Sequence, residues 1–196
     1  MEGKLPNPAD RRVQRTRRML REALIALMLE RGWDVVSVQD ICERADVGRS
    51  TFYTHFADKE ELLVGGFDDL REMIRAGLAQ APASDAPLRF ARGMIDHAHE
   101  NQRLFRALVG KRSGQVVLRR FRELVVTLVR GDLARPRAPP APTTDAAVHF
   151  IAGAFLELLT WWLETRNALE PADIERLFLE MATPALEVVS GKGSTR

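Results

Sequence analysis

Apolar residues recur at a helical period of about 3.6 residues along nearly the whole chain, and no segment shows the alternation typical of a half-buried strand. Within residues 11–31, for example, Leu20, Leu24 and Leu27 share one face. The chain is therefore predicted to be all-α, with about nine helices. Their expected ranges are 11–31, 37–44, 49–56, 59–78, 87–100, 101–109, 114–130, 144–166 and 171–189.

Turn and cap signals mark the ends of the short helices in the first third of the chain. Ser37 offers an N-cap, and Asp40 three residues later completes a shortened capping box. Asp46 tolerates the left-handed conformation that a tight turn needs, and Asp58 is an N-cap for the helix that follows it. Two short helices joined by a turn of about three to four residues match a helix-turn-helix.

The two helices of this motif divide their residues into an inward and an outward set. Val38, Ile41 and Cys42 pack the first helix inward, and Phe52 and Phe56 lock the second helix against it. The outward face of the second helix is polar, and a helix of this width fits the major groove of DNA. The candidate DNA contacts on this face and at the start of the next helix are Arg49, Ser50, Thr51, Tyr53, Thr54, His55 and Lys59.

The distribution of charge adds a second candidate surface, although the formal net charge is only +2. Residues 1–21 hold seven basic and two acidic side chains. This excess is either an electrostatic footprint for nucleic acid or a solvated helix face. Arg15 and Arg18 on the Arg-rich face, together with Ser37, complete the set of candidate DNA contacts.

The segment SVQDICERADVGRSTFYTHFADKEELL, residues 37–63, resembles the DNA-binding signature of the TetR/AcrR family of bacterial transcriptional regulators. The resemblance extends over residues 11–65. Two positions depart from the family pattern, because Asp46 stands at the usual turn Gly and Gly48 at a usual Ser. The matching residues are Ala45, Val47, Thr51, Tyr53, His55, Phe56, Lys59 and Leu62 or Leu63.

The resemblance implies a homodimer in which each chain has a small DNA-binding domain and a larger helical domain. The corresponding ranges are 1–58 and 59–196, with a flexible, Pro-rich linker at 131–143. The larger domain of such regulators binds a small effector and supplies the dimer interface through its last two helices. Pro184 is expected to kink the last helix or to end its regular part.

Apolar stripes in the larger domain provide candidates for the dimer interface and for the effector pocket. Each stripe is also compatible with an ordinary core within one chain, because apolar residues at helical spacing usually are core. The candidate interface residues are Gly153, Phe155, Leu159, Trp162, Ile174, Phe178, Met181 and Ala185. The candidate pocket residues, which favour an apolar or aromatic effector, are Phe90, Met94, Phe105, Leu108, Leu124, Phe150 and Trp161.

Other features argue against several classes of protein. The single cysteine, Cys42, excludes an internal disulfide and fits a reducing compartment, and the start of the chain lacks the apolar stretch of a signal peptide. The apolar run 150–163 is shorter than the roughly 20 residues of a membrane span. His97 and His99 lie on different helix faces, so no metal site is expected. No catalytic motif is recognised, so neither a catalytic residue nor a cofactor is expected.

These patterns, together with what the resemblance implies, predict a cytoplasmic, non-enzymatic regulator of transcription with no membrane partner. The regulator would bind a pseudo-palindromic operator in double-stranded DNA as a homodimer, and it would act as a repressor that a small molecule releases. Two alternatives stay open at this point. The helix-turn-helix could contact a protein instead of DNA, or the helical domain could act catalytically on its ligand.

Overall fold

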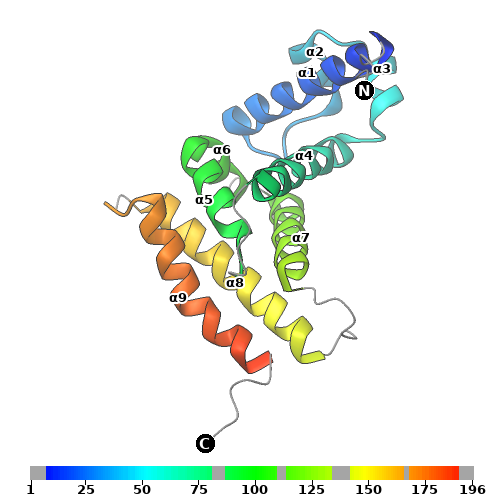
Figure 1. The fold of residues 1–196 in the computed structure, drawn as a ribbon. Coiled ribbons are helices and arrows are strands. Elements are labelled where there is room, and N and C mark those ends of the chain that lie inside the picture. The colour runs from blue at the N-terminus through cyan, green and yellow to red at the C-terminus, as the bar shows by residue number, and fades with distance from the viewer. Residues whose placement is uncertain (1–7, 81–86, 110–113, 134–141, 166–167, 190–196) are drawn as a thin grey trace, which may run out of the picture.

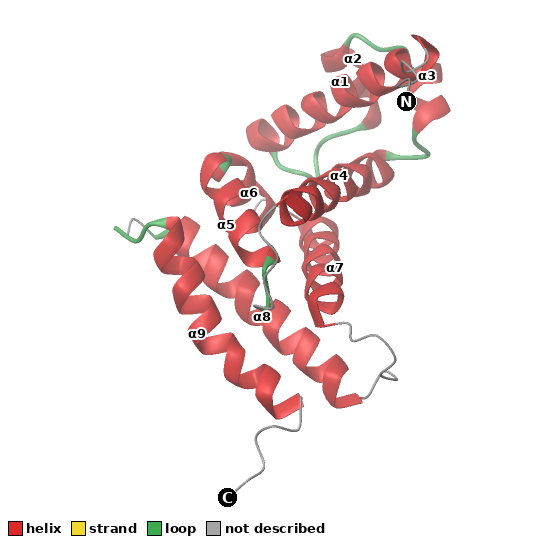
Figure 2. Ribbon diagram, in the orientation of Figure 1, coloured by secondary structure: helices red, strands yellow, loops and turns green. Residues whose placement is uncertain are grey.

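The computed structural model describes residues 8–80, 87–109, 114–133, 142–165 and 168–189. These residues form nine α-helices and no strand, which confirms the predicted all-α class (Figure 1, Figure 2). In chain order the helices are α1 (Pro8–Arg31), α2 (Val38–Ala45), α3 (Arg49–His55), α4 (Lys59–Gln80), α5 (Phe90–Glu100), α6 (Gln102–Val109), α7 (Gly114–Leu133), α8 (Pro142–Glu164) and α9 (Pro171–Val189).

The helices form two groups joined by α4 (Figure 1). The first group, α1 to α3, lies at one end of the molecule, the second group, α5 to α9, makes up the other end, and α4 runs between them. α8 and α9 lie side by side, and α7 packs against α8. The two groups meet where α1 contacts α4 and α6. A shift of α4 or α6 therefore acts directly on the helix that supports α2 and α3.

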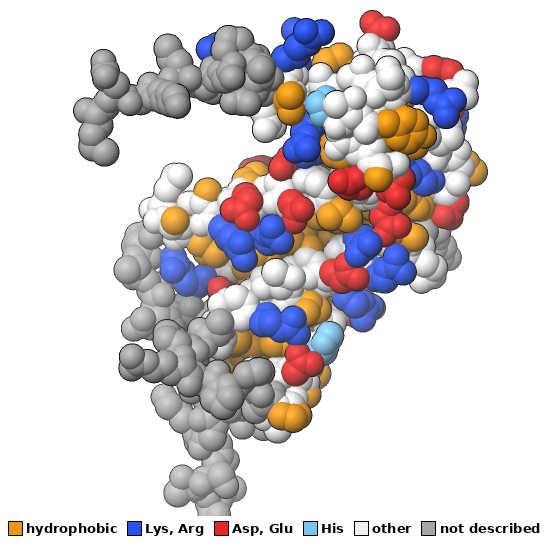
Figure 3. Space-filling view, turned by 90° about the vertical axis from the view of Figure 1, so that its right-hand side faces the viewer, with side chains coloured by type: hydrophobic (Ala, Val, Ile, Leu, Met, Phe, Trp, Pro, Cys, Tyr) orange, Lys and Arg blue, Asp and Glu red, His pale blue; other side chains and the backbone are white. Residues whose placement is uncertain are grey.

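Ion pairs also tie the start of α4 to the second group. Glu60 accepts hydrogen bonds from Nε and Nη2 of Arg120 in α7, at 2.9 and 2.6 Å, and Nη2 of Arg119 lies 3.5 Å from the same carboxylate. Figure 3 shows basic and acidic side chains interspersed over the middle of the face that α4 and α7 present. Because partly exposed pairs contribute little to stability, we infer that these contacts mainly orient α4 relative to α7.

The helix α2 begins at the capping box that the sequence predicts. The Asp40 N–H donates to Ser37 Oγ at 3.1 Å, and the Ser37 N–H donates to Asp40 Oδ2 at 2.9 Å. Two backbone donors that a helix start leaves unpaired are thereby satisfied. At the start of α4, Asp58 likewise accepts a hydrogen bond of 2.8 Å from the Glu61 N–H, which confirms the second predicted N-cap.

Replacing Ser37 with Ala is expected to lower the free energy of unfolding by about 1 kcal/mol, because an N-cap hydroxyl satisfies an otherwise unpaired backbone N–H. Urea denaturation followed by circular dichroism measures this change. Ser37→Thr keeps a hydroxyl at the same position and serves as the matched control. Equal losses of stability in the two variants would show that the cap is not their cause.

The core of the second group is built around an aromatic cluster. Most residues that the sequence predicted for the dimer interface belong to this core. Ring centroids of Phe90, Phe155 and Phe178 lie 4.9 to 6.4 Å apart and join α5, α8 and α9. Because α8 and α9 pack on each other and on this cluster, their shared stripe is core. Met181 is exposed, and Gly153 and Ala185 are half-buried. The candidates that are buried within one chain, and so expose little surface to a partner, are Phe155, Leu159, Trp162, Ile174 and Phe178.

The predicted effector pocket also divides between core and surface. The candidates Phe90, Met94 and Leu124 are buried in the core, in line with the alternative interpretation of their stripes. On α8, Phe150 and Trp161 are 60% and 44% exposed. This exposure corrects their assignment to an enclosed pocket, because a large part of each side chain faces solvent. The remaining candidates, Phe105 and Leu108, do line a cavity, but it lies against α1 and α4.

Helix ends differ from the predicted ones around the Pro-rich segment. α7 continues to Leu133, and α8 begins at Pro142, since Pro is tolerated in the first turn of a helix. The predicted linker 131–143 is therefore helical at both ends, and its remaining residues, 134–141, lie outside the described residues. α9 runs through Pro184 to its end, so this Pro does not terminate the helix.

Length and composition alone would make α8 suitable for crossing a membrane. In the folded chain, however, its apolar stripe from Ala147 to Leu163 is buried, and the helix packs against α7 and α9. A helix buried in this way is a core helix of a globular protein.

Candidate nucleic-acid interface

Asp46 makes the turn between α2 and α3 in the left-handed conformation that the sequence predicts, with φ 52° and ψ 46°. The Val47 N–H donates to the Cys42 carbonyl at 3.0 Å, and the Asp46 N–H donates to the Glu43 carbonyl at 3.3 Å, which closes the end of α2. Gly48 follows as the extended N-cap of α3 and offers no side chain to the cap. The turn therefore forms without the Gly and the Ser that the family pattern has at these two positions.

Burial and a two-pronged ion pair hold α2 on α1. Ile41 and Cys42 are buried, and burial raises the pKa of the Cys42 thiol, so the side chain stays neutral and apolar. Nη1 and Nη2 of Arg44 donate to the two carboxylate oxygens of Glu30, each at 2.8 Å. A bidentate pair of this kind fixes direction as well as distance. The position of α2 relative to α1 is thus set by both packing and charge.

Phe52 and Phe56 anchor α3 to the first group of helices. Both side chains are buried, and their ring centroids lie 5.9 Å apart. The Arg17 guanidinium lies over the Phe56 ring, 5.4 Å from its centroid. The face of an aromatic ring attracts a cation in this position. Since the two Phe residues are one turn apart, the opposite face of α3 points to solvent in a fixed orientation.

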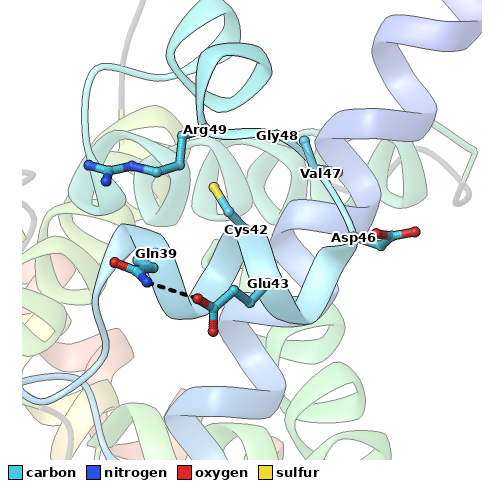
Figure 4. A pocket seen from close by; sticks show the side chains of 7 residues that line it. All are labelled: Gln39, Cys42, Glu43, Asp46, Val47, Gly48 and Arg49. Atoms are coloured by element: carbon cyan, nitrogen blue, oxygen red, sulfur yellow. Dashed lines mark hydrogen bonds between the residues drawn. The ribbon is translucent and has the colours of Figure 1, made fainter.

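The outward face of α3 carries the polar residues that the sequence predicts. Figure 4 shows the Arg49 guanidinium reaching outward from the start of α3. Tyr53 is 52% exposed, while its ring packs edge-on against Phe52 at 5.4 Å between centroids. These side chains present donors and acceptors of the kind that contact base edges and phosphates. The exposed members of the face are Arg49, Ser50, Thr51, Tyr53 and Thr54.

Two residues near the end of α3 are less available than the sequence predicts. Thr54 Oγ1 donates its hydrogen to the Ser50 carbonyl at 3.0 Å, so this hydroxyl can only accept a hydrogen bond from DNA. His55 is half-buried beside Phe56, with 6.4 Å between ring centroids. We therefore expect the first turn of α3 to supply most of the donors to DNA.

Lys59 has partners inside the chain that compete with its predicted phosphate contact. Its Nζ donates to the carbonyls of Trp33 and Val36 at 2.9 and 2.7 Å, and it lies 4.5 Å from the Trp33 ring centroid. Two of the three ammonium hydrogens are thus used. Burial lowers the pKa of Lys59. This structural role carries no signal in the sequence, because the partners are backbone atoms of a distant loop.

Ser37 is likewise occupied, since its N–H and its hydroxyl both donate to Asp40 within the capping box. A phosphate contact by Ser37 would have to break that cap. On α1, Arg15 and Arg18 are exposed and stay candidate contacts. Arg21, in contrast, pairs with a carboxylate of α4. The Arg-rich face of α1 is therefore shared between solvent-exposed and structural cations.

An open depression of about 400 Å³ lies in the corner between α2 and α3 (Figure 4). Gln39 lies on its α2 side, where Nε2 donates to Oε1 of Glu43 at 2.9 Å, and Arg49 lies on its α3 side. A Gln amide can read adenine and an Arg guanidinium can read guanine, each through two hydrogen bonds. We add Gln39 to the candidate contacts. The sequence signal that could have identified Gln39 is its place as a polar residue in the first turn of the first helix of the motif.

Residues 20–64 match the family described as "Bacterial regulatory proteins, tetR family", and residues 85–184 match a "Transcriptional regulator C-terminal region". The chain is 34% identical over 113 residues to the HTH-type transcriptional regulator TcmR of Streptomyces glaucescens. This match covers 57% of the chain and 45% of TcmR, so the chain spans less than half the length of this relative.

Solved structures share the architecture over most of the chain. A TetR transcriptional regulator from Streptococcus agalactiae is 27% identical with a TM-score of 0.66, and the match covers 89% of this chain and 97% of that one. FadR from Bacillus subtilis, in complex with stearoyl-CoA, is 13% identical with a TM-score of 0.57, over 86% and 98% of the two chains. The second likeness shows the fold alone. With the two family matches, these findings place the chain in the TetR family of bacterial transcriptional regulators.

Proposed function

We propose that the chain is a sequence-specific transcriptional repressor that binds a pseudo-palindromic operator as a homodimer and leaves it when a small molecule binds. The observation that carries this proposal is that α3 has one buried side and one exposed polar side. Its buried side, Phe52 and Phe56, fixes a helix whose other side exposes Arg49 and its polar neighbours. Membership of the TetR family favours DNA over a protein as the partner. Such a regulator acts in the cytoplasm and performs no catalysis.

We infer that the dimer forms through α8 and α9, by two residues that the sequence predicted for the interface, Gly153 and Met181, and by two that it assigned to the pocket, Phe150 and Trp161. Phe150 and Trp161 on α8 and Met181 on α9 are large apolar side chains that remain exposed. Phe150 and Trp161 are about three helical turns apart and therefore share one face of α8, and an exposed apolar face marks an interaction site. A Cβ placed on Gly153 would meet no atom within 4 Å, so a second helix has room to approach this part of α8.

Release by a small molecule requires that the ligand change the distance between two recognition helices. In a dimer, these helices must enter successive major grooves about 34–36 Å apart. α4 begins next to α3 and continues into the second group, so its movement would change that spacing. A ligand shifts the equilibrium only if it binds the two arrangements unequally. The Bacillus subtilis regulator of the same fold binds stearoyl-CoA, which supports a ligand-bound state in this architecture.

Selection from randomised duplex DNA, followed by fluorescence anisotropy across a salt titration, tests the proposal. The wild type is expected to select two inverted half-sites whose centres lie about 34–36 Å apart. Its affinity should fall steeply as salt rises, because phosphate contacts release counterions. Failure to select any duplex would refute the proposed function, and selection of a single, non-repeated half-site would refute the dimer.

Arg49→Ala is expected to relax the base preference at one position of each half-site and to weaken binding about tenfold, the effect of losing a forked base contact. Arg122→Ala, which removes an exposed Arg from α7, outside the proposed DNA-binding and dimer surfaces, is the matched control and should leave affinity and consensus unchanged. The same selection and anisotropy measurements apply. An unaltered consensus in the Arg49 variant would show that this residue does not read a base.

A further inference from the structure

A cavity of about 320 Å³ lies between the two groups of helices. α1 contributes Leu24, Ile25 and Met28 to its wall, and most of the rest comes from α4 and α6, including Phe67 and Phe105. A molecule in this cavity would contact the helix that supports α2 and α3 and, at the same time, helix α6 of the second group. The cavity therefore lies where ligand binding can act directly on the DNA-binding end.

The size and lining of the cavity define a class of ligand. Its wall is apolar except for four polar side chains. An apolar cavity of about 150 Å³ holds benzene, and ligand sites in proteins start at about 300 Å³. A volume of about 320 Å³ thus suits a molecule of roughly two fused rings. The rings of Phe67 and Phe105 favour an aromatic ligand, because aromatic pairs attract through edge and face contacts.

Two of the polar side chains supply hydrogen-bond donors. Arg21 lines the cavity with a side chain that is 20% exposed, and its guanidinium pairs with Asp69 across α1 and α4. Nδ2 of Asn101 lies 3.3 Å from Nδ1 of His97. An amide nitrogen only donates, so Nδ1 accepts, and the neutral ring carries its hydrogen on Nε2. Burial lowers the pKa of His97, which keeps the ring neutral. Both donors call for an acceptor oxygen on the ligand.

We propose that this cavity binds a small aromatic molecule that carries an acceptor group such as a carboxylate, and that its occupancy changes the affinity for DNA. The coupling to DNA rests on the proposed function, whereas the binding site does not. Because the ligand contacts α1 and α6 together, it favours one angle between the two groups of helices. DNA binding also selects one such angle, because it fixes the position of the recognition helix. The two affinities are therefore coupled by thermodynamic linkage.

Gly66 offers a way to fill the cavity without disturbing the fold. It lines the cavity, and a Cβ placed on it would meet no atom within 4 Å. Gly77, on the same helix, also has open space at its Cβ but does not line the cavity. Leu at either position replaces a Gly that is unfavourable inside a helix. Both variants are expected to unfold at or above the temperature of the wild type, which a thermal scan checks.

Titration calorimetry with 2-naphthoate tests the site. The wild type and Gly77→Leu are expected to bind one molecule per chain with equal affinity, and Gly66→Leu should bind at least about tenfold more weakly, a difference of about 1.4 kcal/mol. Leu104→Trp, which fills the cavity from α6, should show the same loss. 2-Methylnaphthalene lacks the acceptor oxygens and should bind the wild type more weakly. Absence of saturable binding to the wild type, or equal affinity in all variants, overturns the proposal.

DNA binding separates this inference from the proposed function. Saturating 2-naphthoate is expected to change the affinity of the wild type for its selected duplex at least about tenfold, and to leave that of Gly66→Leu unaltered. If the wild type binds 2-naphthoate in the cavity but binds no DNA, the proposed function fails and the site stands. If Gly66→Leu responds like the wild type, the ligand acts elsewhere, and the cavity proposal fails while the proposed function stands. An unchanged DNA affinity of the ligand-bound wild type overturns the coupling.

Discussion

Replacing Phe52 with Ala is expected to lower the free energy of unfolding by about 3–5 kcal/mol, the range for truncating a buried Phe. The side chain is fully buried, and its ring packs against those of Tyr53 and Phe56. The loss falls on a helix of seven residues, which is too short to be stable without its packing. We therefore expect α3 to lose its fixed orientation and DNA binding to be abolished.

Tyr53→Ala is the matched control, because it removes the neighbouring aromatic side chain from the same helix. Since Tyr53 is about half exposed, the free energy of unfolding should change by less than about 1 kcal/mol. DNA affinity should instead fall for all sequences, as expected for a contact to the DNA backbone. Chemical denaturation and fluorescence anisotropy measure the two effects. A stable, DNA-binding Phe52 variant or an unfolded Tyr53 variant would contradict the division of α3 into a buried and an exposed side.

Lys59→Met is expected to lower the free energy of unfolding by about 2–3 kcal/mol, because two backbone carbonyls lose a charged donor. Met keeps the apolar stem over the Trp33 ring, so the hydrogen bonds are the main change. The acceptors belong to Trp33 and Val36, in the segment between α1 and α2. This segment should loosen, and amide hydrogen exchange across residues 32–37 should become faster. Urea denaturation measures the stability.

Arg18→Met is the control for the loss of a positive charge, since Arg18 is exposed on α1. Its free energy of unfolding should stay within about 0.5 kcal/mol of the wild type. If Lys59 only contacted DNA, Lys59→Met would instead leave stability unchanged and weaken DNA binding. Measuring both quantities in both variants therefore decides between a structural and a DNA-contacting Lys59.

The helix-turn-helix was predictable because its signals are local. The Ser37 cap, the left-handed Asp46 turn and the Asp58 cap all act within a few residues of their own position, and the structure has each of them. The inward side of α3 followed from the spacing of Phe52 and Phe56 alone. Polar side chains would lack hydrogen-bond partners in a core. They were therefore correctly expected on the opposite, exposed side of this helix.

The second group of helices was predicted less well, because an apolar residue at helical spacing does not show what it packs against. Phe150 and Phe155 lie on the same helix and have the same side chain, yet the first is exposed and the second is buried against α5 and α9. The stripe expected to meet a partner chain proved to be core, and part of the residues expected in a pocket proved to be surface. Only the positions of the neighbouring helices separate these cases.

The sequence by itself determined the all-α class, the caps and turn of the helix-turn-helix, and the polar side of α3. The tertiary structure alone decided which apolar faces are core, placed a cavity between α1, α4 and α6, and paired Lys59 with carbonyls 23 and 26 residues away. The physical reason is the range of the interactions. Capping, turns and helical periodicity depend on residues within about one turn, whereas burial and cavities arise where helices distant in the sequence come together.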